Sequence, residues 1–191
     1  MLVSAIAGVQ RMYWAARRCL EASGLYRFGY MPIELLTLLR RDHADLQTEL
    51  TLLLDPNVSI YELRTALDGV RLGLTAHAEA EDIVLAPLER VLGLDRLVAE
   101  SRAAHLAQES ALATLVSMRP GTPAWRDRAH HLRDLVRYHA HREEADLIPS
   151  LAAHPEYSHL AAAFATERLR QLAMLQPSVP VLMADLAAAA M

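Results

Sequence analysis

The stretch HAEAEDIVLAP at residues 77–87 has a counterpart 62 residues later, HAHREEADLIP at residues 139–149. Both copies begin with His, carry Glu at the fifth position and end with Pro. A His and a Glu four residues apart lie one turn apart on the same face of a helix, so both side chains can reach one point. The repeat therefore predicts two equivalent helices, each with an imidazole and a carboxylate on one face.

Helical periodicity extends from both copies and recurs in two other segments. Ser59 and Glu62 form a Ser-x-x-Glu capping box at a helix start, and Thr122 before Pro123 is a typical N-cap. The predicted helices cover about residues 33–54, 59–92, 95–118 and 122–151. Because short loops cannot carry the chain back to its starting end, these helices must alternate in direction. The sequence thus predicts an all-α fold, an up-down-up-down antiparallel four-helix bundle.

The bundle is predicted to occupy residues 33–151, between two extensions. Residues 1–32 form a poorly patterned N-terminal extension, which ends in GYMP. Residues 152–191 form a C-terminal helical extension with one predicted helix at about residues 157–175, before QPSVP interrupts the pattern. We therefore expect one helical domain with an addition at each end.

Composition supports a helical protein and excludes several classes of partner. Hydrophobic residues make up 53% of the 191 residues and aromatic residues only 5%, as is typical of helices packed on helices. A net charge of −4 provides no basic stripe, so we expect no nucleic-acid partner. The N-terminal apolar run is short and soon meets charge, which predicts neither a signal peptide nor a membrane span. The single cysteine, Cys19, cannot form an intramolecular disulfide and favours a cytoplasmic location.

Each predicted helix places one His on its apolar face. In the third helix, the predicted core positions are Leu94, Val98, His105, Leu112 and Val116. A single buried His is most simply a core polar group with a hydrogen-bonding partner. However, His43 and His77 are 34 residues apart, as are His105 and His139, and the two pairs are offset by 62. Core polarity alone gives no reason for this shared register, so the pattern favours a metal site.

The predicted donor set consists of four imidazoles and two carboxylates: His43, His77, Glu81, His105, His139 and Glu143. A mixed nitrogen and oxygen set suits iron, manganese or zinc better than calcium or magnesium. Carboxylates from two opposite helices can bridge two ions, which favours a dinuclear site. A mononuclear zinc site would leave some of these ligands unused.

With these residues in place, the chain resembles the hemerythrin-like, or HHE cation-binding, family. The resemblance covers about residues 33–151 and rests on the two repeated stretches, on RDHADL around His43 and on AAHLAQE around His105. It implies a non-haem di-iron centre with an oxo or hydroxo bridge, with manganese or zinc as less favoured ions. It also implies that all six predicted donors are ligands and that Glu81 and Glu143 bridge the two ions.

Two departures from the respiratory hemerythrins bear on function. Those proteins have a second His one turn before the equivalent of His105, where this chain has Ser101, and an Asp five residues after the last His. Here Glu143 and Glu144 stand four and five residues after His139. The set is similar to carboxylate-richer relatives that are linked to oxygen or iron sensing and to peroxide or nitric oxide chemistry. A missing imidazole leaves a coordination position open.

The leading functional hypothesis is therefore a di-iron protein that binds, senses or reduces a small oxidant, namely dioxygen, peroxide or nitric oxide. An electron donor or protein partner would act through the terminal extensions. The alternatives are a di-iron oxygenase acting on an organic substrate and a structural metal-binding bundle. A deep apolar pocket beside the ligands would favour the oxygenase.

Several other residues near the motifs have alternative predicted roles. Asp82 and Glu144 each follow a motif His by five residues, so they are expected beside the ligands or at the surface unless the helix bulges. Glu109 follows His105 by one turn and is either a seventh ligand or an outer polar group. Pro87 and Pro149 remove backbone donors and are expected to bend their helices.

Overall fold

The computed structural model describes residues 34–91, 93–152 and 157–175, and these residues form helices and short connections without a strand. The α-helices are α2 (Leu35–Leu54), α3 (Ile60–Leu85), α4 (Asp95–Ser117), α5 (Pro123–Arg142), α6 (Ile148–Ala152) and α7 (Tyr157–Leu175). A 3-10 segment, η1 (Ala86–Arg90), follows α3, and a π-helical segment, η2 (Glu143–Leu147), joins α5 to α6. The predicted N-terminal extension, with Cys19, and the end of the C-terminal extension lie outside the described residues.

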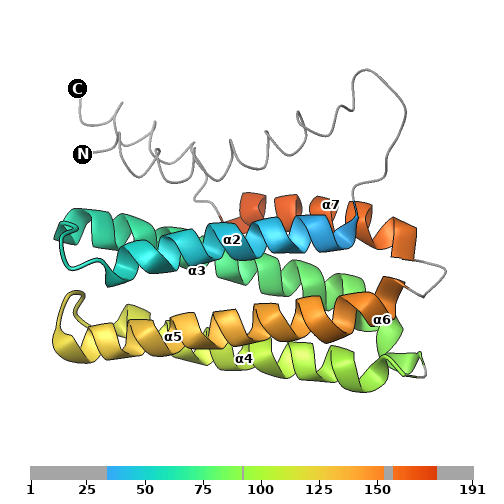
Figure 1. Cartoon of the computed structure of the whole chain (residues 1–191). Helices are drawn as coiled ribbons and strands as arrows, with labels where there is room; N and C mark the ends of the chain where they lie inside the picture. The colour runs from blue at the N-terminus through green and yellow to red at the C-terminus, as the bar shows by residue number, and fades with distance from the viewer. Residues whose placement is uncertain (1–33, 92, 153–156, 176–191) are drawn as a thin grey trace, which may run out of the picture.

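The four long helices form an antiparallel bundle, as predicted. Helix α2 packs against α3 and α5, and α4 packs against the same two neighbours. Successive helices therefore alternate in direction and occupy the four corners of the bundle, with α2 diagonally opposite α4 (Figure 1). Among the described helices, none is long and apolar enough to cross a membrane.

The predicted start signals of two helices are confirmed. The Ser59 hydroxyl accepts from the Glu62 N–H, while the Glu62 carboxylate accepts from the Ser59 N–H, which completes the capping box of α3. The Thr122 hydroxyl accepts from the N–H of Trp125 at the start of α5. Both caps satisfy backbone donors that a helix start leaves free.

The prediction that the second helix continues to residue 92 was wrong. The α-helix ends at Leu85, and the 3-10 segment that follows has Pro87 in its first turn. Proline has no N–H and its ring collides with the carbonyl four residues earlier, so it is tolerated in the first turn of the new segment and not inside α3.

Pro149 has a different effect in the fourth helix. The N–H of Ile148 bonds to the Glu143 carbonyl five residues earlier, which is the π-helical pattern, and Pro149 follows directly. A wider turn moves the preceding carbonyls away from the proline ring, which would collide with one of them in a regular α-helix. The expected geometric role of this proline is thus consistent with a local change in helix type.

The interior contains two apolar clusters. One lies toward the α2–α3 connection and is built from residues such as Leu50, Val70, Leu115, Trp125 and Leu132. The other includes Leu39, Leu85, Leu151 and Phe164. At the end of α4, the predicted core residue Val116 is 46% exposed, and its neighbour Leu115 is buried instead. One residue is 100° of helix rotation, so a small phase error in the sequence pattern selects the wrong neighbour.

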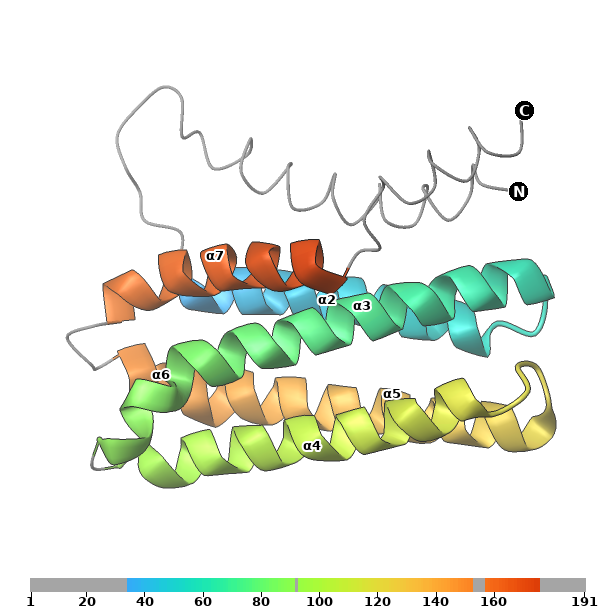
Figure 2. The same ribbon diagram turned by 180° about the vertical axis from the view of Figure 1, so that it is seen from behind.

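Helix α7 has the bounds that the sequence pattern predicts and lies along the outside of α3 and α2 (Figure 2). Its residues Leu160, Ala161 and Phe164 are buried and belong to the second apolar cluster. The helix therefore contributes to the same core as the bundle.

Candidate metal centre

All six predicted donors meet in the middle of the bundle. His43, His77, His105 and His139 come from α2, α3, α4 and α5 respectively, while Glu81 and Glu143 follow one turn after the second and fourth His. Their exposed fractions are only 1–4%. The helix pattern places them here because each occupies a core position flanked by apolar residues.

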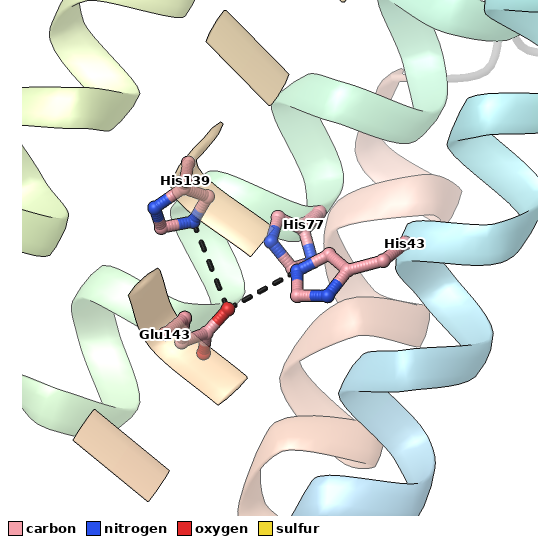
Figure 3. A group of neighbouring side chains, drawn as sticks. All are labelled: His43, His77, His139 and Glu143. Carbon is pink, nitrogen blue, oxygen red and sulfur yellow. Dashed lines mark ion pairs between the residues drawn. The ribbon is translucent and has the colours of Figure 1, made fainter. Parts of the chain in front are cut away.

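The donor atoms form two overlapping groups, in each of which all atoms lie within 4.8 Å of one another. The groups are His43, His77, His139 and Glu143, drawn in Figure 3, and His77, Glu81, His105 and His139. His77 and His139 belong to both groups. The six residues therefore form one continuous cluster of metal-binding side chains.

Each carboxylate lies between imidazoles from two helices. Glu81 Oε2 is 3.5 Å from His77 Nε2 and 3.6 Å from His105 Nε2. Glu143 Oε2 is 3.1 Å from His43 Nε2 and 3.7 Å from His139 Nε2, and dashed lines mark these two approaches in Figure 3. The two halves of the site thus repeat one another, as the 62-residue offset predicts.

The donor atoms that face the centre are short of partners. Five buried atoms make no hydrogen bond of acceptable geometry among the described residues: His43 Nε2, His77 Nε2, Glu81 Oε2, Glu143 Oε1 and Glu143 Oε2. Leaving a buried polar atom unpaired costs about 1–3 kcal/mol, and more for a charged group. Nitrogen and carboxylate lone pairs gathered in this way fit a divalent cation.

Three of the imidazoles are oriented by carboxylates behind them. His43 Nδ1 lies 3.0 Å from Glu144 Oε1, His77 Nδ1 lies 3.2 Å from Asp42 Oδ2, and His105 Nδ1 lies 2.8 Å from Asp82 Oδ1. A carboxylate accepts a hydrogen bond from Nδ1–H, and this tautomer leaves the Nε2 lone pair on the opposite side of the ring. Glu144 lies in the π-helical segment η2, which begins at Glu143, and its side chain still reaches His43.

Arginines contact these carboxylates from outside. Arg40 Nε is 2.8 Å from Glu144 Oε2, and Arg102 Nε is 3.8 Å from Asp82 Oδ2. Arg168 Nε of α7 is 2.5 Å from Asp42 Oδ2. Neither Asp42 nor Arg168 was predicted from the sequence. The position of Asp42 beside His43 was a weak signal for the first, whereas Arg168 lies 126 residues away from its partner and gave none.

Two differences between the halves remove a contact to a donor in one half. The Ser101 hydroxyl donates to Glu81 Oε1 at 2.5 Å, whereas the residue 62 positions earlier, which corresponds to Ser101 in the other half, is Leu39. Asp42 supports His77, whereas the corresponding residue near His139 is Ala104. Ser101 thus contacts a carboxylate of the site from the position where a respiratory hemerythrin has a His. The two halves thus supply equivalent donors, but the residues that hydrogen-bond to those donors differ between the halves.

Burial and mutual repulsion shift the pKa values of the donors. Burial and the nearby Glu143 carboxylate raise the pKa of Glu81 to about 7. Burial disfavours the charged form of His43, but Glu143 and Glu144 outweigh it and raise the pKa of His43 to about 9. Burial and the other imidazoles lower the pKa of His139 well below its usual range. A cation would have to displace any protons held by these ligands.

Glu109, considered as a seventh ligand, is exposed and lies outside both donor groups. Its neighbour Gln108 is buried instead, and both polar atoms of its amide lack a hydrogen-bond partner among the described residues. A narrow apolar pocket lies beside the carboxylates and is lined by Leu35, Leu39, Glu81, Val84, Leu85, Glu143, Ile148 and Phe164.

One of the comparisons with known proteins identifies a family. No significant match was found among curated proteins or among solved structures. The model of the hemerythrin HHE cation-binding domain matches residues 34–151, which include α2 to α6 and all six donors. Together with the buried His and Glu cluster, this match indicates a metal-binding bundle. The chain belongs to the hemerythrin HHE cation-binding domain family.

Proposed function

We propose that this protein holds two iron ions at His43, His77, Glu81, His105, His139 and Glu143 and that it binds, senses or reduces a small oxidant there. The observation that carries the proposal is the buried cluster of imidazoles and carboxylates, in which five donor atoms make no hydrogen bond to a described residue. Four imidazoles and two carboxylates suit iron, with manganese and zinc as alternatives. Bound iron would supply the Lewis acidity and redox capacity for dioxygen, peroxide or nitric oxide.

The residues of the chain have distinct tasks in this proposal. Glu81 and Glu143 would each supply a carboxylate ligand, because each lies between two imidazoles of the cluster. Asp82 and Glu144 hold His105 and His43 with Nε2 directed inward. The Ser101 hydroxyl restrains one oxygen of Glu81, and so leaves the other oxygen for a metal ion.

The packing beside the carboxylates does not favour an organic substrate. The pocket there is too narrow for a water-sized molecule, whereas sites for drug-sized ligands have roughly 300–1,000 Å³. Its wall is apolar apart from Glu81 and Glu143. The oxygenase alternative would require a larger space beside the carboxylates.

Anaerobic loading with ferrous iron tests the di-iron proposal. We expect about two irons per chain, and near-ultraviolet absorption of an oxo-bridged ferric pair after exposure to air. His77→Ala should lose at least half of the iron, because His77 belongs to both donor groups. His141→Ala is the matched control, since His141 is exposed two residues from His139. Fewer than about one iron per chain in the unmodified protein would contradict the proposal.

Exposure of the iron-loaded protein to hydrogen peroxide and to oxygen separates catalysis from binding. Peroxide consumption that disappears in His77→Ala and persists in His141→Ala would establish an enzyme. Reversible oxygen uptake without turnover would instead establish a binding or sensing protein. Full iron occupancy with neither response would contradict the small-oxidant proposal and favour a structural metal.

A further inference from the structure

Helix α7 lies outside the part of the chain that the family model matches, yet it contacts one residue of the site in two ways. The Phe164 ring meets the His77 ring edge to face, with centroids 6.0 Å apart and an interplanar angle of 78°. One turn later, Arg168 contacts Asp42, whose other neighbour is Nδ1 of His77. Both contacts involve the imidazole that belongs to both donor groups.

The link from Arg168 to His77 is short and largely buried. Arg168 Nε and His77 Nδ1 lie 2.5 Å and 3.2 Å from the same oxygen, Oδ2 of Asp42. The side chain of Arg168 is 10% exposed and that of Asp42 is 16% exposed. Asp42 therefore accepts from His77 of α3 and from Arg168 of α7 at the same oxygen.

The other two arginine–carboxylate pairs behind the site are different. Arg40 and Arg102 have side chains that are 59% and 39% exposed, so water screens their interactions with Glu144 and Asp82. Only Arg168, of these three arginines, is buried and comes from outside the matched domain. His139, the counterpart of His77, has Ala104 at the position that corresponds to Asp42.

We propose that Arg168 is a positioning residue that acts through Asp42 to fix the ring of His77, so that α7 sets the metal affinity of the site. This inference rests on the proposed function. Without the guanidinium, Asp42 would carry a partly buried charge with one partner fewer, and its carboxylate would turn toward water. His77 would then lose the acceptor that directs its Nε2 inward. Helix α7 is thus part of the metal site in this chain.

Arg168→Gln tests the inference, with Arg170→Gln as the matched control. Arg170 is on the same helix, is 50% exposed and pairs with Glu167 of that helix. Each full-length variant is titrated anaerobically with ferrous iron against a competing chelator. We expect Arg168→Gln to weaken iron binding about tenfold, as loss of an outer partner of a metal ligand typically does, and Arg170→Gln to remain within about twofold. Arg168→Lys, which keeps the charge, should recover part of the loss.

A double-mutant cycle separates positioning from general stabilisation. Asp42→Asn alone should weaken binding about 10- to 100-fold, and adding Arg168→Gln should cause little further loss, because the arginine acts through Asp42. A purely structural arginine would lower the thermal midpoint of the metal-free protein and leave iron affinity unchanged. Losses of affinity that add in the double variant would overturn the proposal.

Circular dichroism of the metal-free variants establishes that each is folded. If Arg168→Gln is unfolded, Asp42→Asn is the deciding variant. An iron affinity of Asp42→Asn within about twofold of that of the unmodified chain would then overturn the inference. The two proposals fail in different ways. If the unmodified chain bound no iron, the di-iron function would fall with the inference. If it bound iron and Arg168→Gln bound iron equally well, only the role of α7 would fall.

Discussion

Gln108 is the clearest case of a buried polar side chain that lacks hydrogen-bond partners among the described residues. It is 1% exposed, and neither the nitrogen nor the oxygen of its amide has a hydrogen-bond partner among the described residues. It lies one turn after His105 on α4, between the donor layer and Leu112 of the first apolar cluster. An amide in this position costs free energy that an apolar side chain of the same shape would not.

Replacing Gln108 by Met should therefore stabilise the metal-free protein. Met has nearly the same length and no polar group that needs a partner, so we expect the free energy of unfolding in urea to rise by about 1 kcal/mol. Glu109→Met on the exposed face of the same helix is the control and should change it by less than about 0.5 kcal/mol. A loss of stability in Gln108→Met would show that the amide is hydrogen-bonded in solution.

The sequence predicts the six donors of the site but not the outer residues Asp42 and Arg168. His43, His77, Glu81, His105, His139 and Glu143 all occupy core positions of periodic helices, and the repeated spacing marks them as one set. Asp42 reaches His77 across two packed helices, and Arg168 reaches Asp42 only because α7 returns to the bundle. A contact of that kind has no period in the sequence, so it becomes visible only when the helices are packed.

At the scale of the helices, periodicity predicts where each exists, and local backbone chemistry decides where it ends. The start of α3 follows from Ser59 and Glu62, whose reciprocal hydrogen bonds are a short-range property of the sequence. The early end of α3 and the π-helical turn after α5 depend on Pro87 and Pro149. Proline specifies that a regular α-helix must change, and the packing around it selects the alternative.

The capping box of α3 predicts a pH dependence. Hydrogen bonds from the N–H and hydroxyl of Ser59 lower the pKa of Glu62 below its usual value. A lowered folded-state pKa stabilises the protein above the unfolded-state pKa, and the effect disappears as the pH falls through the folded-state value. Glu62→Gln should therefore melt below the unmodified protein near neutral pH. The gap should close between about pH 6 and about pH 3 in thermal unfolding of the metal-free proteins. A gap that persists in acid would contradict the assigned role of the charge.

At the scale of the whole molecule, α7 belongs to the core, although the family match ends before it. Phe164 is 3% exposed and packs among the residues of the second apolar cluster, beside His77 and the pocket. Removal of a ring from a packed core leaves a cavity and removes many contacts. The stability of the bundle should therefore depend on this helix.

Phe164→Ala measures that dependence. We expect the free energy of unfolding of the metal-free protein to fall by about 3 kcal/mol in urea denaturation, as is usual for truncating a buried Phe. Met174→Ala, on the same helix at a position that is 65% exposed, should change it by less than about 0.5 kcal/mol. Equal effects of the two substitutions would mean that α7 is not part of the cooperative core.

The position of Arg168 also has a consequence for the order of events during synthesis of the chain. All six donors are present once the ribosome has reached Glu143, but Arg168 follows 25 residues later. At about 5–20 residues per second, this interval lasts about one to five seconds. Wherever the four donor helices pack before α7 docks, His77 has its partner ligands but lacks its support from α7. A cation that arrives then would meet a looser site than one that arrives once α7 is in place.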